Sequence, residues 1–158
     1  MEQGVQLVLV TPEIPANTGN IVRLCAATMV PLHLVEPLGF AWDDRVLKRA
    51  GLDYWDKCSI RRHLTFEEIE ENAGGAGFHF LTAHADTSFF DRPVRPGDHL
   101  VLGPESTGLP RAFLDRGERR RNACRIPMPG VTRSLNLATA AGIVVYEALR
   151  RLGLLGEA

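Results

Sequence analysis

Cysteine is scarce in this sequence, and its spacing argues against two kinds of small protein. Cys25, Cys58 and Cys124 are odd in number, and no two of them form a C-x-x-C pair. A disulfide framework needs paired cysteines, and a cysteine zinc site needs closely spaced ones. The five histidines (33, 63, 79, 84 and 99) do not cluster with acidic residues at metal-ligand spacing, so we expect them to be structural or surface residues and expect no metal site.

Long apolar runs are also missing. The longest one, in the last thirty residues, is interrupted by Asn136, Thr139 and Glu147. A membrane-spanning helix needs roughly 20 consecutive apolar residues. The first residues, MEQGVQLVLV, lack the basic region and the long apolar core of a signal peptide. We therefore expect a cytoplasmic protein with no membrane segment.

Lysine is almost absent. Lys48 and Lys57 are the only lysines among the 18 basic residues, and the formal net charge of the chain is −1. This balance gives no overall attraction to nucleic acid or to acidic membranes. Arginine suits bidentate phosphate recognition, but arginine richness can equally reflect genome composition or heat adaptation. Both interpretations remain open at this point.

The residues that are present predict one α/β domain over residues 1–158, with no appended second domain. Hydrophobic residues make up 45% of the 158, enough for a single core. Continuously apolar strands that alternate with helices indicate a mainly parallel sheet flanked by helices. The expected strands are 5–10, 31–37, 58–64, 77–83, 98–103 and 123–128; the expected helices are 20–29, 43–52, 65–75, 110–118 and 134–153. Candidate N-caps of three helices are Asn17 or Thr18, Thr65 with Glu68 in a capping box, and Ser134.

Three loops that follow expected strands are unusually rich in proline and glycine. They span residues 12–20, 103–110 and 127–136, and each carries a few polar groups. Proline stiffens a loop, and glycine lets backbone approach a ligand closely. Ligands gather at the carboxyl ends of strands in open α/β sheets. The loops therefore predict a binding site, although glycine and proline can also serve simply as turn residues.

The common nucleotide-binding and hydrolase motifs are absent. The sequence contains no G-x-G-x-x-G and no G-x-x-x-x-G-K-[ST], so a Rossmann dehydrogenase or a P-loop NTPase is poorly supported. It also contains no H-E-x-x-H and no G-x-S-x-G.

Three spaced motifs resemble those of the SPOUT RNA 2′-O-ribose methyltransferases. They are N-x-G-N-x-x-R at 17–23, L-G-P-E-x-x-G-L at 102–109, and I-P-M at 126–128 followed by R-S-L-N-L at 133–137. In addition, residues 36–55 are similar to the signature of one branch, the small tRNA wobble-nucleotide 2′-O-methyltransferases. The resemblance covers residues 5–152, nearly the whole chain.

This resemblance implies a C-terminal part threaded as a deep trefoil knot, and S-adenosylmethionine as the cofactor. General topology rules treat knots as nearly absent, so this expectation rests on the resemblance alone. Glu105 would either meet the positive end of the cofactor or order its own loop, and we favour loop ordering. The implied cofactor-binding residues are Leu81, Thr82, Gly103, Glu105, Ile126, Met128, Ser134 and Leu135.

The reaction implied is methylation of a ribose 2′-hydroxyl at the wobble nucleotide, cytidine or uridine 34, in the tRNA anticodon region. Arg23, Ser134 and Asn136 are the implied catalytic residues. A guanidinium titrates above about 12, so we assign Arg23 to positioning and charge stabilisation, and its part in proton removal stays open. The implied RNA-binding residues are Asn17, Asn20, Arg23, Arg133 and Tyr146, with a basic patch of Arg119, Arg120 and Arg121.

The last expected helix is apolar over much of its circumference. Leu137, Ala141, Val144, Ala148 and Leu152 lie on one face, and Ala138, Val145 and Leu149 on a neighbouring one. Such a helix is buried on two sides. It is either a central core helix or, as the resemblance implies, the seam of a homodimer. Two other functions also remain open: a ribosomal RNA 2′-O-methyltransferase of the same fold, and a catalytically silent RNA-binding module that retains the knot.

Overall fold

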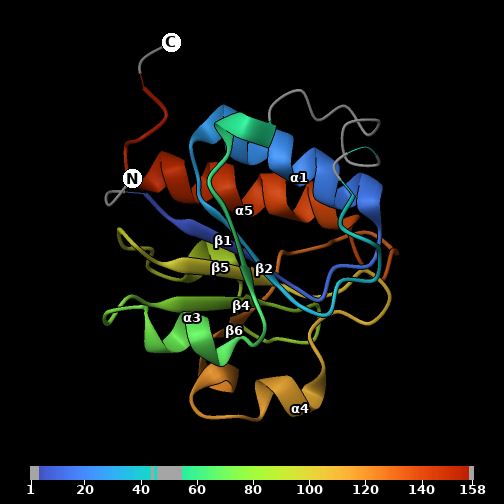
Figure 1. The fold of residues 1–158 in the computed structure, drawn as a ribbon. Coiled ribbons are helices and arrows are strands. Elements are labelled where there is room, and N and C mark those ends of the chain that lie inside the picture. Colours follow the sequence, from blue (N-terminus) through green and yellow to red (C-terminus); the bar gives the residue numbers. More distant parts are fainter. Residues whose placement is uncertain (1–3, 44, 46–54, 157–158) are drawn as a thin grey trace.

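The computed structural model describes residues 4–43, 45 and 55–156 and contains one six-stranded sheet (Figure 1). Every neighbouring pair of strands is parallel, in the order β3-β2-β1-β5-β4-β6. The predicted parallel α/β sheet is therefore confirmed. The strands are β1 (Gln6–Val10), β2 (Leu32–Val35), β3 (Ile60–His63), β4 (Phe78–Leu81), β5 (His99–Leu102) and β6 (Ala123–Cys124).

Helices cover both faces of the sheet. Helices α1 (Pro15–Thr28) and α5 (Leu137–Arg151) lie together on one face, and α3 (Glu67–Glu71) and α4 (Arg111–Leu114) lie on the other (Figure 1). Alternating residues of β1 serve the two sides: Leu7 and Leu9 join the core under α1 and α5, while Val8 and Val10 join the core under α3 and α4. The described residues also form three short 3₁₀ helices: η1 (Trp55–Lys57), η2 (Phe89–Asp91) and η3 (Arg119–Asn122).

Helix α1 starts five residues earlier than the sequence predicted. Pro15 occupies the first turn and Ile14 is the N-cap, without a side-chain hydrogen bond of its own. The fixed φ of proline suits the first helical position. Asn17 and Thr18 are consequently buried inside the helix, and the prediction that either of them caps it is wrong.

Two further cap predictions are also wrong. The N-cap of α3 is Phe66, and no side chain caps that helix, so Thr65 does not have the predicted role. The N-cap of α5 is Asn136 rather than Ser134, because the Asn136 side chain accepts hydrogen bonds from the backbone of Ala138 and Thr139. The helix predicted over residues 43–52 lies largely outside the described residues.

Helix α5 is a core helix of the single chain. Most residues of its two predicted apolar faces, Leu137, Ala141, Val144, Val145, Ala148 and Leu149, are buried against the sheet and α1. Ala138 and Leu152 are partly buried against the same core. The core interpretation of these faces is therefore correct, and only a narrower strip of α5 remains at the surface.

The chain after β6 is inserted between two other segments. On one side, the backbone N–H of Thr82 donates to the carbonyl of Cys124 at 2.8 Å. On the other side, Arg125 bonds to residues 87–89, since Phe89 N–H donates to its carbonyl at 2.7 Å and its own N–H donates to Thr87 at 2.9 Å. Residues 124–125 are thus held on both sides as they run toward α5.

Two further observations concern classes of site that the sequence made unlikely. Among the described residues, no helix combines the length and the apolar character that a membrane crossing requires. Within the same residues, no three or more His, Cys, Asp or Glu side chains are grouped so that they could hold a metal ion.

Candidate active-site cleft

A cleft of about 590 Å³ lies where the three proline- and glycine-rich loops meet. Its size falls within the usual range for small-molecule sites. Four parts of the chain line it: Ile14 and Asn17 from the start of α1, residues 81–84 after β4, residues 102–108 after β5, and residues 126, 128, 133–137 and 140 after β6. The predicted gathering of the three loops at the carboxyl edge of the sheet is therefore confirmed.

The structure brings all eight predicted cofactor-binding residues into this one cleft. Leu81, Ile126, Met128 and Leu135 supply apolar surface, and Thr82 and Ser134 supply hydroxyl groups. Gly103 and Glu105 come from the loop after β5. Their contact with a cofactor stays a prediction, but their positions share one cavity.

Glu105 joins the loop after β5 to the backbone just before α1. Its carboxylate accepts hydrogen bonds from the backbone N–H of Glu13, at 3.1 Å to each oxygen, and from that of Ile14. These N–H groups stand just before α1, where the first donors of a helix need partners. These contacts support the loop-ordering interpretation of Glu105.

Glu13 in turn binds the loop that carries Glu105. Its Oε1 accepts hydrogen bonds from the backbone N–H of Ser106 at 3.0 Å and from the Ser106 hydroxyl at 2.6 Å. The hydrogen bonds from Ser106 lower the pKa of the Glu13 carboxyl below its ordinary value. The loops after β1 and β5 are therefore joined by two carboxylates, each bonded to the other loop.

Only glycine fits at position 103, because the backbone of Gly108 and Leu109 passes very close to it. A Cβ atom at this position would lie 2.3 Å from the backbone nitrogen of Leu109 and 2.5 Å from the carbonyl carbon of Gly108. The loop closes on itself through the Gly108 N–H, which donates to the Pro104 carbonyl at 2.8 Å. A side chain at position 103 would therefore force the loop open.

Asn136 links the two helices that begin at the cleft. Its Oδ1 accepts hydrogen bonds from the N–H groups of Ala138 at 2.9 Å and Thr139 at 3.3 Å, which caps α5. Its Nδ2 donates to the Oδ1 of Asn17 on α1 at 3.0 Å. Asn17 is buried, so both side chains are held in fixed orientations beside the cavity.

Outside the basic patch, three of the predicted catalytic and RNA-binding residues do not line the cleft of the single chain. Asn20 and Arg23 are exposed on α1, beyond Asn17, and Tyr146 is half-exposed on α5. Arg133 and Ser134, by contrast, line the cleft and remain exposed. The structure therefore assembles the cofactor-side residues and leaves Asn20, Arg23 and Tyr146 on the outer surface of the two helices.

The predicted basic patch needs one correction. Arg119 is only 4% exposed, and its guanidinium binds Glu70 through Nε and Nη2, both at 2.9 Å. The same guanidinium lies over the rings of Phe66 and Phe113, 4.7 Å and 4.2 Å from their centroids. Arg119 is therefore a buried structural residue and is not available to RNA. The sequence shows only a run of arginines, and it does not reveal which of them packs inward.

The other two arginines of the patch lie on the surface. Arg120 pairs with Asp115, and Arg121 pairs with Glu118 at 3.2 Å, with side chains 55% and 82% exposed. Exposed pairs of this kind are weak, so both guanidiniums can exchange their partners for phosphate.

Sequence reasoning missed several residues that line the cleft. His84 does so, although the histidines were predicted to be structural or surface residues, and its backbone N–H donates to the Thr82 hydroxyl at 3.3 Å. Ile14 and Ala140 contribute from the starts of α1 and α5. The available signal for His84 was its place directly after an apolar strand, the same signal that singled out the other loops.

A comparison with known families gives a match over most of the chain. Residues 4–146 match the SpoU rRNA Methylase family. The chain belongs to this family. The matched residues include the loops that form the cleft.

Individual relatives agree with this assignment. A tRNA (cytidine(34)-2′-O)-methyltransferase of Photorhabdus asymbiotica is 44% identical over 155 residues, which is 95% of each chain. A solved structure described as giving insights into the 2-OH methylation of C/U34 on tRNA is 45% identical, with a TM-score of 0.88, over 97% of this chain and 99% of that one. An rRNA methyltransferase from Sinorhizobium meliloti, solved with AdoMet bound, is 25% identical with a TM-score of 0.81, over 96% of this chain and 58% of that one.

Proposed function

We propose that this protein transfers a methyl group from S-adenosylmethionine to the ribose 2′-hydroxyl of the wobble nucleotide, cytidine or uridine 34, in tRNA. The observation that carries the proposal is the single cleft formed by the three motif loops, in a chain that matches wobble-nucleotide methyltransferases over nearly its full length. No observation on the described residues favours a ribosomal RNA substrate or a silent binding module over this function.

The cleft fits the cofactor in size and in chemistry. Apolar side chains, among them Leu81, Ile126 and Met128, can enclose an adenine ring, while loop backbone supplies hydrogen-bonding groups. Gly103 keeps the loop after β5 tightly folded, and Glu105 fixes that loop to the start of α1. These residues would therefore hold the cofactor in a preformed cavity.

When bound, the cofactor supplies a sulfonium-activated methyl group, and the protein's own part is alignment and assistance to proton loss. The Asn17–Asn136 pair fixes the cavity wall beside Ser134, and Arg133 brings positive charge to the same edge. Arg23 always carries its charge, so we assign it to holding a phosphate of the substrate and stabilising developing negative charge. The group that finally accepts the proton is left unassigned.

We further propose that the enzyme works as a homodimer through the exposed strip of α5. Tyr146 is 48% exposed there, and Gly142 and Ile143 remain only half-buried in the single chain. Asn20, Arg23 and Tyr146 do not reach the cleft of their own chain, which supports a site completed by the partner's copies of them. An elution volume that matches a monomer at micromolar concentration would contradict this part of the proposal.

The trefoil knot belongs to the same proposal. Residues 124–125 run between β4 and residues 87–89 and are hydrogen-bonded on both sides before the chain enters α5. This insertion supports a C-terminal part that passes through the loop formed by residues 82–98.

The proposed function is tested by methyl transfer from labelled S-adenosylmethionine to tRNA that lacks the wobble modification, followed by nucleoside analysis. Label in 2′-O-methylcytidine or 2′-O-methyluridine at position 34 is the expected result. Label at another ribose would overturn the substrate assignment, and cofactor binding without any transfer would point to the silent module. Arg23→Ala should abolish transfer, whereas Arg111→Ala, at an exposed arginine of α4 that does not line the cleft, should not.

A further inference from the structure

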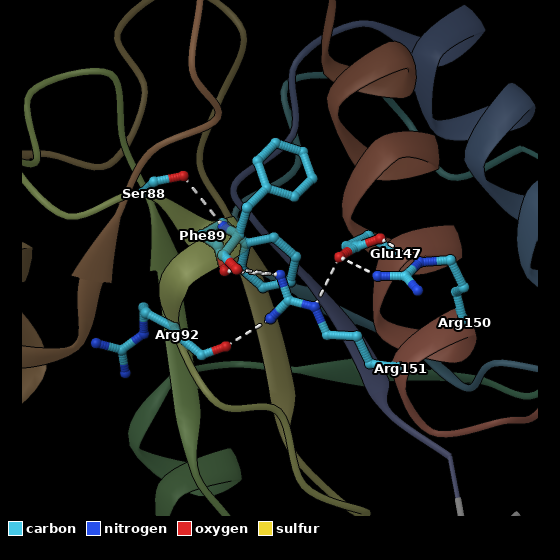
Figure 2. A network of polar contacts seen from close by, with 7 residues as sticks. Ser88, Phe89, Arg92, Glu147, Arg150 and Arg151 are labelled. Atoms are coloured by element: carbon cyan, nitrogen blue, oxygen red, sulfur yellow. Dashed lines mark hydrogen bonds and ion pairs between the residues drawn. The ribbon is translucent and has the colours of Figure 1, made fainter.

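Arg151, in the last turn of α5, ties that helix to the segment that follows β4. Its Nη1 donates to the carbonyl oxygen of Arg92 at 2.5 Å, and its Nη2 donates to the carbonyls of Phe90 at 2.6 Å and Phe89 at 3.4 Å. Figure 2 shows the guanidinium reaching from α5 to this backbone, and it lies 5.4 Å from the centroid of the Phe89 ring. One side chain therefore holds three carbonyl groups of the 89–92 backbone.

Glu147 orients this guanidinium. Its Oε1 accepts a hydrogen bond from the Nε of Arg151 at 2.7 Å. Arg150 bonds to the same carboxylate, at 2.9 Å and 3.1 Å, but none of its hydrogen bonds among the described residues reaches the 89–92 segment. Figure 2 shows the two arginines on either side of Glu147, with only Arg151 directed at the loop. The chain thus contains two neighbouring arginines that share Glu147 and differ in whether they contact the 89–92 segment.

The segment held by Arg151 is connected to two walls of the cleft. Upstream it continues from residues 82–84, which line the cavity after β4. Sideways it bonds to Arg125, through the Phe89 N–H and the Thr87 carbonyl, and the next residues, Ile126 and Met128, line the cavity after β6. The far end of α5 contributes Asn136, Leu137 and Ala140 to a third wall.

We propose that Arg151 is a positioning residue for the cofactor cleft. It fixes the 89–92 backbone to the end of α5, and this anchor holds residues 82–84 and 126–128 at the spacing that the cavity requires. The buried Phe89 ring already holds this segment against the core through apolar packing. The role of Arg151 is therefore to fix the position of the segment's backbone, and the segment should stay attached to the core without it. The inference rests on the proposed function only in taking S-adenosylmethionine as the occupant of the cleft.

The first test is hydrogen exchange on the protein without cofactor. Arg151→Met removes the guanidinium and keeps the apolar stem; Arg150→Met is the matched control, because it removes a Glu147 partner without touching the loop. In Arg151→Met we expect the amides of Thr82, Phe89 and Arg125 to exchange at least about tenfold faster, through local opening. In Arg150→Met they should keep the wild-type rates. Equal protection of these three amides in both variants would overturn the proposal.

The second test is the affinity for S-adenosylmethionine, measured by calorimetry well below the melting temperature. Arg151→Met should weaken Kd about tenfold, which corresponds to about 1.4 kcal/mol. Arg150→Met should leave it unchanged. In turnover, Arg151→Met should raise KM for the cofactor more than it lowers kcat. A lower melting temperature with unchanged Kd would assign Arg151 to stability alone and overturn the proposal.

A third variant, Arg151→Lys, guards against a loss of folding in Arg151→Met. Lysine keeps the charge and can reach one carbonyl, but it lacks the planar fork that binds several acceptors. We expect exchange rates and Kd between those of the wild type and Arg151→Met, and wild-type values in both measurements would contradict the positioning role. Wild-type protein that fails to bind S-adenosylmethionine would refute the proposed function itself, whereas equal binding by wild type and Arg151→Met refutes only this inference.

Discussion

Glu13 and Glu105 each accept hydrogen bonds from the loop that carries the other. Glu105 receives the N–H groups of Glu13 and Ile14, and Glu13 receives both the N–H and the hydroxyl of Ser106. Because the two residues are 92 positions apart in the chain, this reciprocal contact forms only in the folded protein. It also gives the unpaired donors before α1 the partners that a local cap would otherwise supply.

The first prediction concerns Glu105. Replacement of Glu105 by Ala leaves two backbone N–H groups before α1 without acceptors, and we expect a loss of about 1–2 kcal/mol in the free energy of unfolding. Glu105→Gln should cost less, since its amide oxygen still accepts one hydrogen bond. Urea denaturation measures both. Glu118→Ala, which removes an exposed surface pair, should change stability little, and a loss equal to that of Glu105→Ala would contradict the specific role of Glu105.

The second prediction concerns Gly103. A methyl group at this position would meet the backbone of Gly108 and Leu109 rather than a movable side chain. Gly103→Ala should therefore destabilise the protein by more than about 3 kcal/mol, in the range reserved for severe packing and backbone conflicts. Thermal unfolding measures the change. Gly130→Ala is the matched control, because a Cβ there has no neighbour within 4 Å, and it should leave the melting temperature nearly unchanged.

The sheet, its parallel strands and the gathering of three loops could be predicted from local sequence. Apolar runs such as residues 5–10 and 98–103 identify buried parallel strands, because both faces of such strands are covered. The rule that ligands gather at the carboxyl ends of these strands then places the loops together. These features could be predicted because each depends on a short, continuous stretch of sequence.

Contacts between distant segments could not be predicted in the same way. Asn17 and Thr18 are good caps by residue type, but Pro15 starts α1 earlier and Glu105 supplies acceptors from a far loop. Arg119 looks like its neighbours in the sequence, and only the pairing of α3 with α4 and η3 reveals the buried site between Glu70, Phe66 and Phe113. Such positions depend on tertiary packing, which overrides local preference.

The third prediction concerns the pH dependence of stability. Burial, together with His63, His99 and Arg61, lowers the pKa of His33 from 6.5 to about 4. The unfolded chain therefore binds this proton at higher pH than the folded protein does. Stability should be complete above pH 6.5 and should fall as the pH drops from 6.5 through 4, by up to about 3 kcal/mol from this group.

The variant His33→Gln should remove most of this slope, as measured by urea denaturation at a series of pH values. His84→Gln, which replaces an exposed histidine, should keep it. A wild-type slope in His33→Gln between pH 6.5 and 4 would assign the proton uptake to other groups.

The fourth prediction separates the structural arginine of the basic patch from those on its surface. Arg119→Ala removes a buried side chain from between Phe66 and Phe113 and leaves the partly exposed Glu70 without this partner, so we expect a loss of about 2–5 kcal/mol in the free energy of unfolding, mainly from the cavity. Arg119→Met should be tolerated better, because an apolar side chain of similar length fills the space between the rings.

Arg121→Ala should behave in the opposite way. Its side chain is 82% exposed and pairs with the exposed Glu118, so stability should barely change. If Arg121 contacts a tRNA phosphate, its loss should weaken tRNA binding and reduce the slope of log K against log salt by about one, since each neutralised phosphate releases counterions. Filter binding from low to moderate salt measures that slope. An unchanged slope in both Arg121→Ala and Arg120→Ala would exclude this surface from the RNA interface and leave Arg23 and Arg133 to carry the phosphate contacts.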